Sequence, residues 1–226
     1  MTTTLTIPQA LFLLARDDET GKPKGNYNNY IQAGGAMAEL VLQSRITLSA
    51  DRKRRVTVRD ASPTGSVFLD AVLARLSKSP RPRTLQHWVS RLSSMSGRVE
   101  MIGDELAALG AVERQSLHMF GLFPVTRWPA RNGQTKGRLL AEMSGHLFNE
   151  HSAINERTAS IIALANAGHL LKRNFDRDLL RQHKSNIKSL TRGDWPAAKA
   201  ARDAIDAVNA AVAASSAVIV AASASG

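Results

Sequence analysis

Five cationic side chains recur at helical spacing in the last quarter of the sequence. They are Arg173, Arg177, Arg181, Lys184 and Lys188, which stand four, four, three and four residues apart. At about 100° per residue, this spacing predicts that all five lie on one face of a helix. Such a face is either the solvated side of a core helix or a basic surface for anions. Near an acidic leaflet, each cation contributes about 1 kcal/mol of binding free energy.

Residues that could perform acid–base or covalent catalysis are scattered. His146 and His151 lie five residues apart with no Glu after the first, so the paired-histidine pattern of zinc proteases is absent. The consecutive carboxylates of "RDDE" at 16–19 point in different directions and are typical of a helix flank. The chain contains no Cys, no glycine-rich phosphate loop and no nucleophile elbow. The sequence therefore predicts a non-enzymatic protein without a metal or cofactor, and a small-molecule hydrolase is the least favoured function.

Large apolar side chains cluster around chain-turning residues in "LHMFGLFPVTRWPARN", at 117–132. The cluster contains Phe120, Leu122, Phe123 and Trp128, with Arg127 beside the last ring. Phe120 and Leu122 suit a packed core and an exposed tip equally well. Trp128 is harder to bury, because its neighbour Pro129 cannot donate to a β-ladder and Arg avoids dry sites. We therefore expect a hairpin on which these five residues contact the headgroup region of a membrane, where amphipathic rings are favoured.

The charge of the chain indicates the class of partner. Its 30 Lys+Arg against 19 Asp+Glu give a formal net charge of +11, which indicates nucleic acid, an anionic membrane or an acidic protein. The absence of Cys suits a reducing cytoplasm. No apolar run reaches ~18 residues, and the N-terminus lacks the pattern of a signal peptide. We expect a cytoplasmic protein that attaches to a membrane only at its surface.

Apolar periodicity predicts a mainly α protein that forms a single globular helical domain over residues 1–226. The expected helices cover 7–17, 27–42, 62–79, 81–94, 98–112, 135–150, 155–193 and 194–215. Alternating apolar residues predict two β-hairpins, at about 45–59 and 117–129. Gly34 and Gly35, in the second expected helix, would permit close approach of a neighbouring helix.

The first expected hairpin supports an alternative function. "RITLSADRKRRVTVRD" carries a basic tip at Arg52, Lys53, Arg54 and Arg55. A winged-helix DNA-binding protein would use such a tip to reach phosphates. Reading base edges also requires a neighbouring helix rich in Arg, Asn or Gln, and no such helix is evident. Nucleic acid is therefore the less favoured partner.

The order of several segments resembles the Golgi phosphoprotein 3 family, in the form carried by bacterial members. The segments are "ELVLQSRITL", "DASPTGSVFLDAVL", "TLQHWVSRLS", "ELAALGAV", "GLFPVTRWP" and "GDWPAAKAARDAIDAV", and they span nearly the whole chain. The resemblance implies a helical domain with a protruding hydrophobic hairpin. It also implies a peripheral, non-enzymatic adaptor on the cytoplasmic face of a membrane, because eukaryotic members bind phosphatidylinositol 4-phosphate. The hairpin would serve membrane contact or homo-oligomer formation.

The resemblance also implies a headgroup pocket. In eukaryotic members it uses a Trp and an Arg before the "EL" run, and these positions fall at Lys24 and Ala33 of this chain. Two further basic positions fall near Ser96 and Val99, with Arg98 beside them. Arg98 and Lys24 are therefore the candidate headgroup donors. A phosphomonoester requires several converging charge-assisted donors, so we expect binding of phosphoinositide or another anionic lipid.

Overall fold

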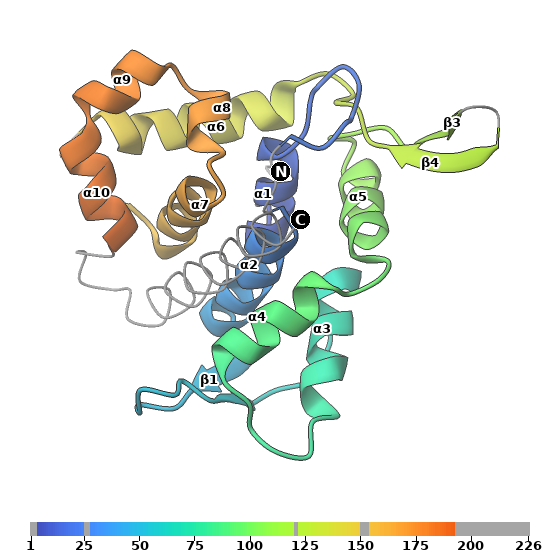
Figure 1. Cartoon of the computed structure of the whole chain (residues 1–226), viewed down its shortest axis with the longest axis vertical. Coiled ribbons are helices and arrows are strands. Elements are labelled where there is room, and N and C mark those ends of the chain that lie inside the picture. The colour runs from blue at the N-terminus through green and yellow to red at the C-terminus, as the bar shows by residue number, and fades with distance from the viewer. Residues whose placement is uncertain (1–3, 25–27, 120–121, 150–153, 193–226) are drawn as a thin grey trace, which may run out of the picture.

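Ten helices and two hairpins form the part of the chain that the computed structural model describes, residues 4–24, 28–119, 122–149 and 154–192 (Figure 1). The helices are α1 (Ile7–Leu14), α2 (Asn28–Leu42), α3 (Val67–Ser77), α4 (Leu85–Ser93), α5 (Arg98–Ala108), α6 (Gln134–Phe148), α7 (Glu156–Ala167), α8 (Leu171–Asn174), α9 (Arg177–Gln182) and α10 (Lys184–Arg192). This confirms the predicted mainly α class with two hairpins. The expected helix at 194–215 lies outside the described residues, as does Phe120.

Helix α1 is buried along its whole length and lies at the centre of the core. Thr6 starts it with a capping box, in which the Thr6 hydroxyl accepts from the Gln9 backbone N–H and the Gln9 side chain accepts from the Thr6 N–H. Pro8 fits the first turn, where a missing N–H breaks no helical hydrogen bond. The helix then packs against α2, α5, α6 and α7. One short apolar segment thus organises most of the body.

Helices α1 and α2 approach closely because α2 presents Gly35. A Cβ at this position would lie 2.9 Å from Leu11 Cδ1 and 3.1 Å from Ile7 Cγ2. The first distance is shorter than real Cβ contacts, so a larger residue would force the two helices apart. The predicted close helix contact is therefore confirmed at Gly35.

Two carboxylates join the helices inside the body. Glu39 on α2 is fully buried, accepts a hydrogen bond from the Ile7 N–H at 2.9 Å, and pairs with Arg157 of α7 at 2.7 Å. Glu105 on α5 accepts from the side chain of Gln9 and from Ser66 and Phe68 at the start of α3, each at 2.9 Å. Because the fully buried Glu39 and the half-buried Glu105 need donors in place of water, each of these groups fixes the relative positions of three helices.

The prediction of one continuous helix over 155–193 is wrong. The segment forms α7, α8, α9 and α10 instead. His169 adopts a left-handed φ of 57° directly after α7, and Phe175 is extended after α8. Asp176 then caps α9, since its carboxylate accepts from the N–H groups of Asp178 and Leu179. Apolar periodicity passes across these breaks, because each short helix turns an apolar side chain inward: Leu171 of α8 is buried, and Leu180 of α9 and Ile187 of α10 are partly buried against the core.

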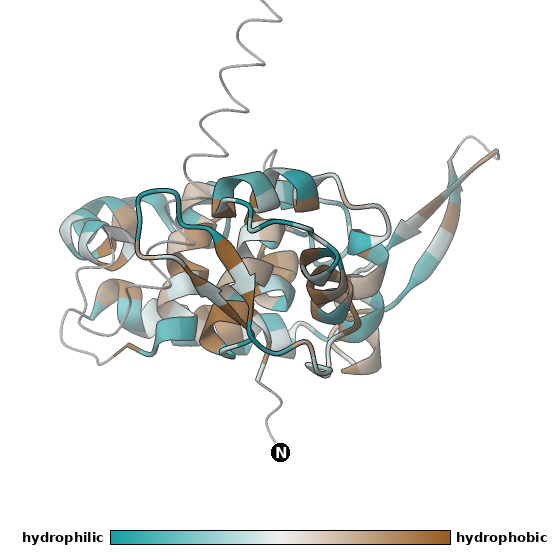
Figure 2. Cartoon of the chain, turned by 90° about the horizontal axis from the view of Figure 1, so that it is seen from below, coloured by the Kyte–Doolittle hydropathy of each residue, from teal (hydrophilic) through white to brown (hydrophobic). Residues whose placement is uncertain are grey.

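The strands form two separate antiparallel hairpins. Strand β1 (Ile46–Leu48) pairs with β2 (Val56–Val58), and β3 (Gln115–Met119) pairs with β4 (Phe123–Arg127). The second hairpin projects from the body beside α5, and Figure 2 shows the same projection from another side. Both hairpins lie where alternation predicts them. Among the described residues, no helix combines the length and apolar character needed to cross a bilayer.

Candidate functional site

The projecting hairpin has one apolar and one polar face. Side chains alternate along a strand, and directly paired residues share a face. With Leu117 opposite Val125 and Gln115 opposite Arg127, one face carries Gln115, Leu117, Phe123, Val125 and Arg127. The other face carries Ser116, His118, Pro124 and Thr126. The hairpin is therefore an amphipathic ribbon, with a cation on the apolar face at its base.

This apolar face is open to solvent. Leu117 is 50% exposed, Phe123 is 62% exposed, and Leu122 in the turn is 78% exposed. These three are half of the six large apolar side chains that stand exposed among the described residues. A soluble protein rarely leaves such a concentration unpartnered unless it contacts a membrane or another protein there.

The predicted position of Trp128 on the exposed part of the hairpin is wrong. The ring is 2% exposed and stacks edge-on against Phe12 of α1, with ring centroids 5.9 Å apart. A Cβ on Gly103 of α5 would lie 2.3 Å from the indole, so the missing side chain makes room for it. The ladder ends at Arg127, and Trp128 is the first residue inside the body. Trp128 therefore anchors the base of the hairpin.

A buried cation accompanies this anchor. The Arg16 guanidinium lies 3.8 Å from the centroid of the Phe12 ring and 5.5 Å from that of Trp128. Burial, together with the nearby charge of Arg127, lowers the pKa of Arg16 to about 10. No carboxylate pairs with Arg16 within the described chain. The rings of Phe12 and Trp128 thus face this cation where a carboxylate would otherwise lie.

The C-terminal helices gather cations around a pocket of about 700 Å³. Its basic lining residues are Lys172, Arg177, Arg181, Lys184 and Lys188, and its apolar ones are Leu171, Leu180 and Ile187. Four of the five predicted basic residues therefore meet here, although on two helices rather than one. Arg173 is not among the lining residues, and Lys172 takes part in its place. Periodicity could not reveal Lys172, because it assumes one continuous helix. The breaks between α8, α9 and α10 change the direction in which side chains point.

These geometries can be compared with known proteins. The family model for Golgi phosphoprotein 3 matches residues 7–208. The chain belongs to the Golgi phosphoprotein 3 family. Over 91 aligned residues it is also 34% identical to a VPS74-like protein from Dictyostelium discoideum. The aligned region covers 36% of this chain. The chain covers 35% of that relative's length. The family match covers the projecting hairpin and all ten described helices. It confirms the resemblance expected from the sequence.

The headgroup positions implied by the Golgi phosphoprotein 3 resemblance do not form an open basic site. Arg98 is 5% exposed, and burial lowers its pKa. Its guanidinium donates to the side chains of Gln32 at 3.0 Å and Asn29 at 2.6 Å, and to the Ser93 carbonyl at 2.7 Å. The predicted role of Arg98 as a headgroup donor is therefore corrected, because its hydrogen bonds join α2 to the end of α4.

Lys24, the other implied headgroup donor, is accessible but already paired. Its Nζ lies 2.8 Å from the carboxylate of Asp17, and the hydrogen bond from Lys24 lowers the pKa of Asp17 well below its usual range. Ala33, at the second implied position, is buried in α2. The role of Lys24 as a headgroup donor stays a prediction. Lys24 alone would supply one charged donor, whereas a phosphomonoester needs several.

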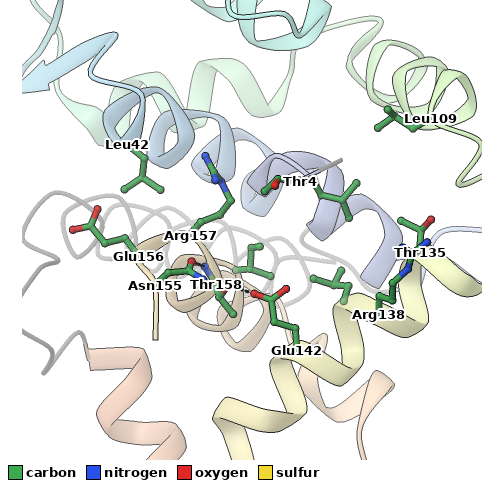
Figure 3. A pocket seen from close by; sticks show the side chains of 13 residues that line it. Thr4, Leu42, Leu109, Thr135, Arg138, Glu142, Asn155, Glu156, Arg157 and Thr158 are labelled. Atoms are coloured by element: carbon green, nitrogen blue, oxygen red, sulfur yellow. Dashed lines mark hydrogen bonds between the residues drawn. The ribbon is translucent and has the colours of Figure 1, made fainter. Parts of the chain in front are cut away.

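A second pocket, of about 680 Å³, lies between the segment before α1 and helices α6 and α7 (Figure 3). Its polar side chains mostly serve the fold. Arg157 turns toward Glu39, the Thr158 hydroxyl donates to Glu142, and Asn155 caps α7. Leu5, Leu139 and Ile161 supply apolar walls. Because Arg157 is paired with Glu39 and the lining also contains the carboxylates of Glu142 and Glu156, this second pocket offers less for an anion than the basic pocket does.

Proposed function

We propose that this protein is a peripheral membrane protein that binds phosphoinositide or other anionic lipid and acts as a non-enzymatic adaptor at the cytoplasmic face. The exposed apolar face of β3–β4 carries this proposal. The surplus of cations supports it, since lipid headgroups are anionic. Membership of the Golgi phosphoprotein 3 family also favours an adaptor over an enzyme, and it favours lipid over the winged-helix alternative.

The hairpin and the charges are both required on energetic grounds. Complete burial of one Leu or Phe side chain contributes about 1.5–3 kcal/mol, and the hairpin offers few such side chains beyond Leu122 and Phe123. One small apolar anchor gives only marginal membrane binding, and a basic surface supplies a second signal. Arg127, at the base of the same face, would then reach the headgroups while the tip enters the apolar layer.

Replacing Leu122 and Phe123 together with Ser is expected to weaken binding to acidic vesicles by about tenfold or more. Their exposure of 78% and 62% means that the fold loses little packing, so the thermal midpoint should stay nearly unchanged. Vesicle co-sedimentation and thermal unfolding measure the two effects. Val67→Ser is the matched control, because Val67 is 64% exposed on α3, outside the hairpin. This control should bind like the unaltered protein.

Other outcomes identify other functions. Wild-type binding to acidic vesicles should weaken as salt rises, because exposed charges are screened over about 10 Å at 0.1 M. Equal binding to neutral vesicles contradicts the proposal.

If the Leu122 and Phe123 variant keeps full vesicle binding but loses self-association in sedimentation, the hairpin forms a homo-oligomer. Tighter binding to duplex DNA than to vesicles at matched salt favours the basic tip at Arg52 and Lys53.

A further inference from the structure

We infer that the pocket between α7, α8, α9 and α10 is a binding site for the phosphomonoester headgroup of a membrane lipid. It is separate from the positions of Lys24 and Arg98 implied by the family resemblance. The inference rests on the proposed function, because it requires the protein to reach a membrane. Residues 171–192 contain seven Lys+Arg and two Asp, so this short segment has a strong excess of positive charge. The net charge of the whole chain is +11. Positive charge is therefore concentrated around this pocket.

The cations converge from neighbouring helices. Arg177 and Arg181 are one turn apart on α9, and Lys184 and Lys188 are one turn apart on α10, so each pair lies on one face. Helix α10 packs against both α9 and α7. The two pairs and Lys172 of α8 line one pocket. A phosphomonoester, with three terminal oxygens and a charge of about −1.5 to −2, is an anion that several such donors can share.

The charges have little internal compensation. Arg181 lies 3.2 Å from Asp178, in a pair that is largely exposed. Within the described residues, no carboxylate forms an ion pair with the other four basic lining residues. Like charges one turn apart also weaken a helix slightly, and both α9 and α10 carry such a pair. The arrangement therefore does not serve helix stability, and a bound anion would relieve the repulsion.

The apolar lining favours a lipid over a free phosphate or a nucleic acid. Leu180 and Ile187, which are half-buried, line the same pocket together with the buried Leu171. A free phosphate would leave these side chains facing water. The glycerol and first methylene groups of a lipid would cover them and remove their apolar surface from water. Cations around an apolar floor thus match both parts of one amphiphile.

The test compares two kinds of phosphatidylcholine vesicle. One contains about 10 mol% phosphatidic acid, and the other contains about 20 mol% phosphatidylserine, so that their surface charges are similar. The unaltered protein is expected to prefer the phosphatidic acid vesicles by about tenfold, because only they present a phosphomonoester. Lys184→Glu with Lys188→Glu should abolish this preference. Both lysines are exposed at α10, so the thermal midpoint should change little.

Arg52→Glu with Lys53→Glu is the matched control, because it makes the same charge change at an exposed loop outside the pocket. This variant should keep the preference. Equal losses in the two variants would show that total charge acts instead, and would overturn the pocket while the proposed membrane function stands. Competition by soluble glycerol 3-phosphate as strong as that by the lipid would overturn the lipid assignment. Absence of wild-type binding to any acidic vesicle would refute the proposed function itself.

Discussion

Replacing Trp128 with Ala is expected to lower the free energy of unfolding by about 3–5 kcal/mol, a large part of the stability of an ordinary domain. The indole is 2% exposed between Phe12 and Gly103, so its removal leaves a cavity at the base of the hairpin. Phe123→Ala removes a ring of similar size from an exposed position five residues earlier and should cost little. Urea unfolding of the two variants measures this difference.

A double-mutant cycle with Gly103 tests the cause of the loss. In the unaltered protein, Gly103→Ala places a Cβ 2.3 Å from the indole and should be strongly destabilising. With Trp128→Ala already present, the same change meets no ring. Gly103→Ala should then be neutral or stabilising by up to about 1 kcal/mol, since Ala favours a helix interior. Additive costs would contradict direct contact between residues 103 and 128.

Replacing Arg157 with Met is expected to cost about 3–5 kcal/mol, because it leaves the Glu39 carboxylate buried without its cation. Glu39 is fully buried, and Arg157 donates to it at 2.7 Å and 3.1 Å. The same hydrogen bonds raise the pKa of Arg157. Because Glu39 also accepts from the Ile7 N–H, the loss should loosen α1, α2 and α7 together.

The matched second change is Glu39→Gln. A Gln side chain can still accept from the Ile7 N–H while carrying no charge, so adding it to Arg157→Met should recover more than half of the lost stability. Glu39→Gln alone should cost about 1–3 kcal/mol, because one partner of a buried polar pair is weakened. Chemical unfolding of the four proteins gives the coupling free energy. A double variant no more stable than Arg157→Met would show that packing, and not buried charge, dominates.

Local patterns in the sequence determined the helices up to α6 and the two hairpins, but not the breaks that divide residues 155–193. The Thr6 capping box and the alternation at 117–127 depend on residues a few positions apart, and local geometry decides such features. Net charge and the concentration of basic residues after position 170 were equally available from composition. The family resemblance also came from short segments in a fixed order, and the family match confirms it.

The tertiary structure alone decided which side of each element meets water. Trp128 is buried because Phe12 and Gly103, distant in sequence, form its pocket. Arg98 is withdrawn from the surface because α2 supplies acceptors at Asn29 and Gln32. The basic residues after α7 surround a pocket because helix breaks fold three short helices together. The spacing of apolar residues shows only which positions share a face of one continuous helix or strand. Whether that face is buried depends on residues that the fold brings together from distant parts of the chain.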